Sequence, residues 1–158
     1  MSENVKFSIA IPVRNGEKYL KEALASAVSQ LRKPDEILVV DDDSTDGSAE
    51  IAKSSEWGGK VQYRYNSPAT GFVDAWNRAA TMASGDYVTI LHQDDLLHPE
   101  FLARMEAALD RYPNVEHLYT ACNYIDEFGN MTGKSSAASS NAPILYSGQE
   151  YARGYLYG

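Results

Sequence analysis

The sequence has little cysteine and little positive charge. Cys122 is the single cysteine among 158 residues, so the chain has neither an internal disulfide nor a cysteine-based zinc site. Lys and Arg number 14 against 22 Asp and Glu, a formal net charge of −8. No cluster of basic residues offers a stripe that would neutralise phosphates, which argues against a nucleic-acid partner.

Long apolar runs are also absent. No segment approaches the roughly 20 apolar residues that span a membrane, and the amino terminus lacks a basic-then-apolar signal segment. We therefore expect a cytoplasmic protein with no transmembrane segment, and we leave peripheral association with the inner membrane face open. The glycine-rich dinucleotide and Walker motifs, HExxH and GxSxG are missing as well, which excludes the chemistries that depend on them.

What is present is an ordinary globular balance of 44% apolar and 23% charged residues, with strand and helix patterns in alternation. Short apolar runs predict strands at 7–11, 37–40, 61–65, 87–91 and 118–125, the last placing Cys122 in the core. Helical spacing predicts helices at 20–31, 46–53, 72–83 and 99–112, with Phe72 and Trp76 on an apolar face. This order predicts an α/β fold with a mainly parallel sheet flanked by helices.

The loops that follow three of these strands carry the candidate chemistry, because such sheets bind ligands at the carboxyl ends of their strands. Adjacent carboxylates repel, so Asp94–Asp95 after the fourth strand predicts a divalent cation, Mg²⁺ or Mn²⁺, together with a substrate diphosphate. The alternative is that both aspartates merely cap the helix near Pro99 or face water. Asp41–Asp43 after the second strand could bond a base or ribose, or simply begin the following helix.

Taken together, three ordered segments resemble family-2 glycosyltransferases of the GT-A fold, which has a Rossmann-like sheet. They are Ser8–Gly16 (SIAIPVRNG), Ile37–Gly47 (ILVVDDDSTDG) and Ala83–Asp95 (ASGDYVTILHQDD). The resemblance implies a nucleotide-diphosphate sugar donor and an inverting transfer to an acceptor hydroxyl. It also implies a glycan or lipid-linked acceptor, in the synthesis of polysaccharide or cell-envelope glycan.

By position, the resemblance also implies site residues. Nucleotide contacts fall on Pro12, Val13, Asn15, Asp41, Asp42 and Asp94, and the metal ligand falls on Asp95. Asp42 would lie on the base and Asp94 on the ribose side. Three positions depart from the family pattern: His92 stands for an aspartate, Asp43 for a glycine and Trp76 for an arginine, whose contact Arg14 could replace.

For domain organisation we expect a donor-binding domain at 1–133, then a mobile loop and the start of an acceptor-side region at 134–158, as in a truncated enzyme. Asp126, Glu127 and Glu150 are the acidic residues past the fifth predicted strand, and none is a convincing general base. We therefore expect the base to lie beyond residue 158, and this chain to bind donor without transferring sugar. Two alternatives remain: a non-catalytic nucleotide-sugar-binding module, and a sugar-phosphate nucleotidyltransferase, which usually has a glycine-rich basic loop after the first strand.

Overall fold

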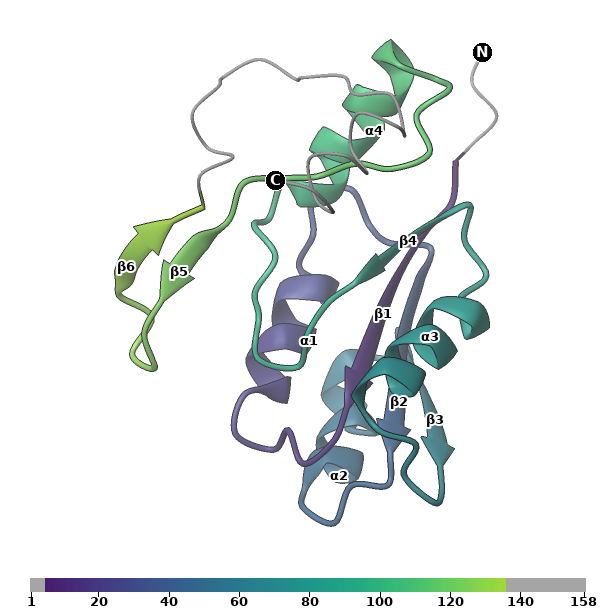
Figure 1. Ribbon diagram of the computed structural model, residues 1–158, viewed down its shortest axis with the longest axis vertical. Helices are drawn as coiled ribbons and strands as arrows, with labels where there is room; N and C mark the ends of the chain where they lie inside the picture. The colour runs from purple at the N-terminus through teal and green to yellow at the C-terminus, as the bar shows by residue number, and fades with distance from the viewer. Residues whose placement is uncertain (1–4, 136–158) are drawn as a thin grey trace, which may run out of the picture. The chain divides into compact units, whose positions relative to one another are not determined.

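The computed structural model of this chain describes residues 5–135. It divides into two compact units, Met1–Val115 and Glu116–Gly158, each of which is described by itself. The first unit is built on a four-stranded sheet in the order β3-β2-β1-β4 (Figure 1). Its strands are β1 (Phe7–Val13), β2 (Glu36–Asp42), β3 (Val61–Asn66) and β4 (Tyr87–Ile90). Every neighbouring pair is parallel, which confirms the predicted α/β class.

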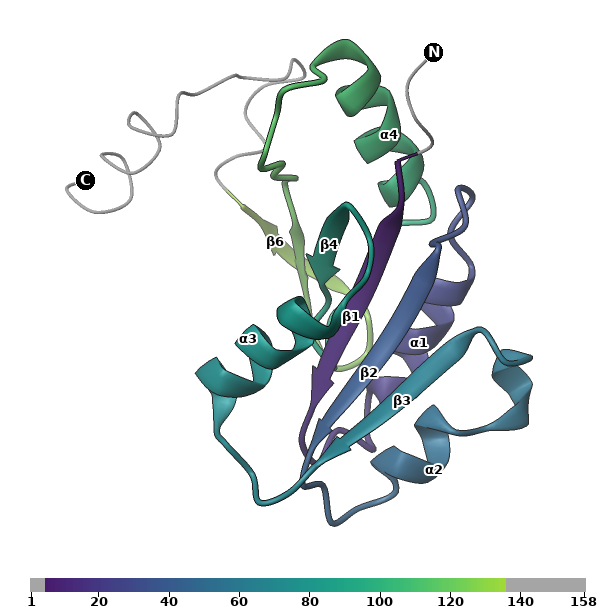
Figure 2. The ribbon, with the colours of Figure 1, turned by 90° about the vertical axis from the view of Figure 1, so that its right-hand side faces the viewer.

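Helices cover both faces of this sheet. Helix α3 (Phe72–Met82) lies on one face, and α1 (Leu20–Val28) and α2 (Ser48–Ala52) lie on the other (Figure 2). A short 3₁₀ helix, η1 (Ser55–Trp57), precedes β3, and α4 (Phe101–Arg111) follows β4. The predicted helix at 20–31 thus ends three residues early, and Leu31 is exposed.

The core lies between the central strands and the helices. All seven residues of β1 are buried, as expected for a strand covered on both faces. On the α3 face, Ala79 packs with Ala10, Leu38 and Val40. The small alanine side chains let the helix approach the sheet closely, so one end of α3 is held near the carboxyl ends of β1 and β2.

Strand register brings the candidate loops together. Val13 at the end of β1 lies opposite Asp41, and Asp42 at the end of β2 lies opposite Asn66. Strand β4 ends at Ile90, and the next residue is still bonded to β1, since Leu91 N–H donates to Ala10 O at 3.0 Å. The segment from His92 onward can therefore reach the loop that follows β1.

A buried amide ties the segment after β4 to helix α1. The Gln30 side chain is 0% exposed, and its Nε2 donates to Ser26 O (3.1 Å) and His98 O (2.9 Å). Its Oε1 accepts from Leu102 N–H at 3.1 Å. Since the residue before α4 makes no side-chain cap, Gln30 satisfies one of the free N–H groups at the start of that helix.

The second unit contains a hairpin of β5 (Asn123–Ile125) and β6 (Met131–Lys134). Asp126 accepts from Phe128 N–H and Asn130 N–H, so the predicted turn is confirmed. The predicted strand at 118–125 is wrong over its first five residues, and Cys122 is exposed rather than in the core. The physical reason is pairing: β5 bonds to β6 alone, over three residues, and all three are exposed.

Within residues 5–135 no helix combines the length and the apolar character that a membrane crossing needs. The predicted region at 134–158 lies almost wholly outside the described residues, and Glu150 lies outside them too. The proposed division at 133 therefore stays a prediction.

Candidate functional site

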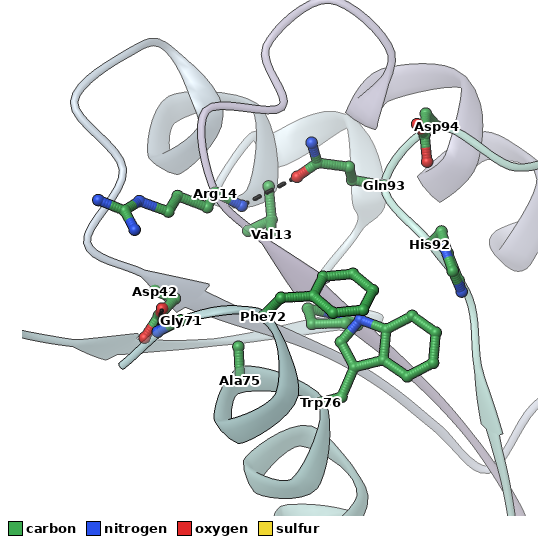
Figure 3. A pocket seen from close by; sticks show the side chains of 11 residues that line it. Val13, Arg14, Asp42, Gly71, Phe72, Ala75, Trp76, His92, Gln93 and Asp94 are labelled. Carbon is green, nitrogen blue, oxygen red and sulfur yellow. Dashed lines mark hydrogen bonds between the residues drawn. The ribbon is translucent and has the colours of Figure 1, made fainter. Parts of the chain in front are cut away.

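A pocket of about 360 Å³ lies at the carboxyl ends of β1, β2 and β4 and the start of α3 (Figure 3). Its volume is in the range of small-molecule sites. Figure 3 shows Asp42 beside Gly71 on one side and Asp94 on the other, with the rings of Phe72 and Trp76 between them. The lining residues are Pro12, Val13, Arg14, Asp42, Gly71, Phe72, Ala75, Trp76, His92, Gln93 and Asp94.

The loop after β1 is fastened to the loop after β4. Arg14 N–H donates to Gln93 Oε1 at 2.9 Å (Figure 3). A Cβ at Gly16 would stand 2.8 Å from that same oxygen and from Val13 Cγ2, so only glycine fits there without a shift. Arg14 is the one Lys or Arg among the lining residues, and Arg78 does not line the pocket.

Asn15 and Asp41 do not line the pocket. Asn15, at φ 51°, accepts from Thr45 N–H through its Oδ1 at 2.8 Å and so joins the loops after β1 and β2. Asp41 is fully buried and accepts from Ser44 N–H (2.8 Å) and the Tyr63 hydroxyl (2.6 Å). Both residues hold the loop that carries Asp42 and Asp43.

Asp42 lines the pocket, but its carboxylate already accepts hydrogen bonds from neighbouring residues. It accepts from Asn66 Nδ2 (2.7 Å), from the hydroxyl and N–H of Thr70, and from Gly71 N–H (3.0 Å). Burial acts to raise the pKa of Asp42, but these hydrogen bonds outweigh it and hold the pKa below its usual range. The carboxylate is thus ionised at neutral pH, and it shapes the turn that begins α3.

Asp43 explains one departure from the family pattern. Its φ is 67°, a left-handed conformation that glycine adopts without strain and that aspartate tolerates better than most residues. The Tyr65 hydroxyl donates to its Oδ1, and this bond leads the contacts that lower the pKa of the Asp43 carboxyl. Asp43 thus adopts the backbone conformation that a glycine would adopt at this position, and its side chain is held by the bond from Tyr65.

The carboxylates after β4 are exposed. Asp95 N–H donates to His92 O at 3.2 Å, which closes a turn over 92–95. Asp94 lines the pocket and Asp95 does not. Across the described part of the chain, no three His, Cys, Asp or Glu side chains form a group that would hold a metal ion by itself.

Two exposed carboxylates nevertheless suit Mg²⁺ or Mn²⁺. Mg²⁺ keeps several waters and is commonly held by one or two carboxylates plus substrate phosphates. Within residues 5–135, helix α4 begins without a side-chain cap, so neither Asp94 nor Asp95 acts as its cap. The donor set therefore fits a hard divalent cation that arrives with a diphosphate.

Sequence reasoning missed the aromatic part of the site. Phe72 is 68% exposed and Trp76 is half-buried, whereas the buried face of α3 is formed by Ala75 and Ala79. The predicted helix is confirmed, but the apolar face on which we placed Phe72 and Trp76 is not the buried face of that helix. Gly71, at φ 89°, turns the chain so that the first helical residue faces the pocket. Gln93 was also missed, since a single glutamine in a polar loop carries no signal of its own.

Comparisons with known proteins agree with this arrangement. A family model described as Glycosyl transferase family 2 matches residues 8–151. The putative glycosyltransferase EpsE of Bacillus subtilis (strain 168) is 27% identical over 158 residues, which is 99% of this chain and 57% of that protein. Some curated relatives are longer still, and the chain spans as little as 15% of their length.

Two solved structures share the fold. S. aureus TarS 1-349 in complex with UDP-GlcNAc has a TM-score of 0.63 at 26% identity. The aligned region covers 76% of this chain and 40% of the TarS chain. The mannosyltransferase PcManGT from Pyrobaculum calidifontis, in complex with GDP-Man and Mn²⁺, has a TM-score of 0.60. The aligned region covers 68% of this chain and 33% of the PcManGT chain at 24% identity, a likeness that shows the fold alone.

Proposed function

We propose, because this chain belongs to glycosyltransferase family 2, that its pocket binds a nucleotide-diphosphate sugar as the donor for glycosyl transfer. One observation carries the proposal. A single pocket at the carboxyl edge of a parallel sheet joins the loops after β1, β2 and β4, with Asp42 on one side and Asp94 on the other. Ligands of such sheets bind at this edge.

The donor would lie across this edge. We place the base near Asp42, the ribose near Asp94, and the backbone of Pro12 and Val13 along the nucleotide. Asn15 and Asp41, which do not line the pocket, would act indirectly by holding its loops in place. The similarity to TarS, which was solved with UDP-GlcNAc, supports a uridine nucleotide as the first donor to test.

Asp95, with Asp94 beside it, would hold Mg²⁺ or Mn²⁺. When bound, such a cation neutralises the diphosphate and stabilises the departing nucleotide. Without it, the two carboxylates would repel the diphosphate. Arg14 is the one Lys or Arg on the pocket wall. Its side chain extends toward the Asp42 side (Figure 3), where it would offer a positive charge to the bound nucleotide.

We further propose inverting transfer to a hydroxyl of a glycan or lipid-linked acceptor, in cell-envelope glycan synthesis at the cytoplasmic face of the membrane. Inversion needs a general base beside the acceptor hydroxyl. Asp126 is unsuited, because its oxygens accept from Phe128 N–H, Asn130 N–H and Asn130 Nδ2 within the hairpin turn. The base therefore stays unassigned, and we expect donor binding without transfer from this chain.

Calorimetry tests the proposal. UDP, GDP, CDP, dTDP and UDP-GlcNAc are titrated into the chain with Mn²⁺ and with chelator, and we expect metal-dependent binding of at least one. Asp95→Asn should weaken that binding by roughly tenfold or more with unchanged thermal stability, since the side chain is exposed. Glu22→Gln, an exposed acidic residue of α1, is the matched control. Equal binding in chelator would refute the metal role, and no binding at all would refute the function.

A non-catalytic module is the second candidate. An assay for sugar release or transfer from the bound donor distinguishes the two, because an enzyme would release or transfer the sugar and a non-catalytic module would not. Glycosyl transfer by this chain at a rate equal to that of a longer form would contradict our expectation of binding alone.

A further inference from the structure

We propose that Phe72 stacks on the nucleobase of the donor, and that Trp76 and His92 support it from behind. This inference rests on the proposed function and adds to it the surface that recognises the base. It assigns a role to two positions, 76 and 92, at which this chain departs from its family.

The three rings form a cluster of tilted and edge-to-face contacts on the wall of the pocket. The Phe72 and Trp76 ring centroids lie 4.6 Å apart, and the Trp76 and His92 centroids lie 4.3 Å apart with their planes at 76°. Phe72 and His92 are farther apart, at 6.5 Å, so Trp76 stands between them. Trp76 is thereby covered from two directions, whereas Phe72 at 68% exposure offers a ring surface to a ligand (Figure 3).

The turn before α3 places Phe72 beside Asp42. Gly71 N–H donates to Asp42 Oδ2 at 3.0 Å, and Thr70 N–H donates to both oxygens. Phe72 follows directly as the first residue of the helix. A base that binds at the Asp42 side of the pocket would therefore meet the Phe72 ring.

Asp42 has little capacity left to read the base by hydrogen bonds. A carboxylate offers about four acceptor sites, and here four donor groups already occupy them. Its role on this account is to position α3 and its aromatic ring. Recognition of the base then falls to stacking, which accepts any planar base because every base has a π face.

The ring is better placed for the base than for the transferred sugar. The diphosphate needs a cation, which the pocket can gather at Asp94 and Asp95, on the side away from Asp42. No aromatic residue occurs in Pro12–Gly16, so Phe72, Trp76 and His92 are the aromatic side chains that line the pocket. Among these, Phe72 is the one that directly follows Gly71, whose N–H is bonded to Asp42.

Calorimetry with two probes separates base recognition from phosphate recognition. UDP and inorganic pyrophosphate are each titrated with Mn²⁺ into the wild type and Phe72→Ala. We expect Phe72→Ala to raise the Kd for UDP roughly tenfold, within the range measured for base–aromatic stacking, and to leave pyrophosphate within about twofold. Phe72→Tyr, which keeps the ring, should stay within about threefold of the wild type for UDP.

Val73→Ala is the matched control. Val73 is 67% exposed in the same helical turn and does not line the pocket, so its loss should change neither affinity. Equal weakening of UDP and pyrophosphate, or no weakening of UDP, would overturn the inference. Weakening of UDP-GlcNAc with UDP unchanged would place the ring on the sugar and also overturn it. A wild type that binds none of these probes would instead refute the proposed function itself.

Discussion

Replacing Asp42 by asparagine tests how β2 builds the edge of the pocket. Asp42 is 2% exposed, and four donor groups of Asn66, Thr70 and Gly71 converge on its two oxygens. Asparagine keeps one oxygen and places an amide donor where the other stood, so at least one of these donors loses its acceptor. Because a hydrogen bond to a charged group contributes about 1.5–3 kcal/mol, we expect the free energy of unfolding to fall by about 2–4 kcal/mol.

The pH dependence follows from the same bonds. Burial acts to raise the pKa of Asp42, yet the bonds from Thr70, Asn66 and Gly71 lower it below the unfolded value of about 3.9. A carboxylate with a lowered folded pKa adds stability above its unfolded pKa and loses that contribution as pH falls through the folded pKa. The difference between the wild type and Asp42→Asn should therefore be full at pH 7 and shrink below about pH 4.

Urea unfolding at neutral and acid pH measures this difference, with UDP affinity followed in parallel. Asp74→Asn, on the exposed side of α3, is the control, and its effect should be within about 0.5 kcal/mol. A loss below about 1 kcal/mol for Asp42→Asn, or a loss that does not change between pH 7 and pH 3, would refute the account of Asp42 as the anchor of the turn.

Three further substitutions test other contacts. Gly16→Ala should weaken nucleotide binding several-fold, roughly 1 kcal/mol, because its Cβ would displace Gln93 and Val13; calorimetry with UDP checks this. Gln30→Ala should lower the free energy of unfolding by about 2–3 kcal/mol in urea, since it leaves Ser26 O, His98 O and Leu102 N–H without their buried partner. Gly85→Ala should cost about 1–3 kcal/mol or more and lower the Tm, because its Cβ would stand 2.7 Å from Ser8 N and 2.9 Å from Lys6 O, which are backbone atoms that cannot turn aside. A change in Tm smaller than that of Gly59→Ala, where the Cβ meets no atom and only the backbone at φ 74° is strained, would contradict this.

The order of strands and helices in the first unit could be predicted from the sequence. Its apolar runs, helical spacing and Pro and Gly breaks are local signals, and β1 to β4 and their helices lie close to the predicted ranges. The strand at 118–125 could not be predicted in the same way. An apolar run says nothing of its pairing partner, and here the partner is β6.

For the site, the sequence by itself determined which loops meet, because the carboxyl ends of parallel strands share one edge of a sheet. It thereby indicated that the loops 12–16, 41–43 and 92–95 form one region, and residues of all three line the pocket. Only the tertiary structure decided which side chains face the ligand. Asp41 turns inward to Tyr63, and Phe72 turns outward because Gly71 and Asp42 set where α3 begins. A helical period specifies the spacing of apolar residues, but the direction of the first turn depends on hydrogen bonds from another strand.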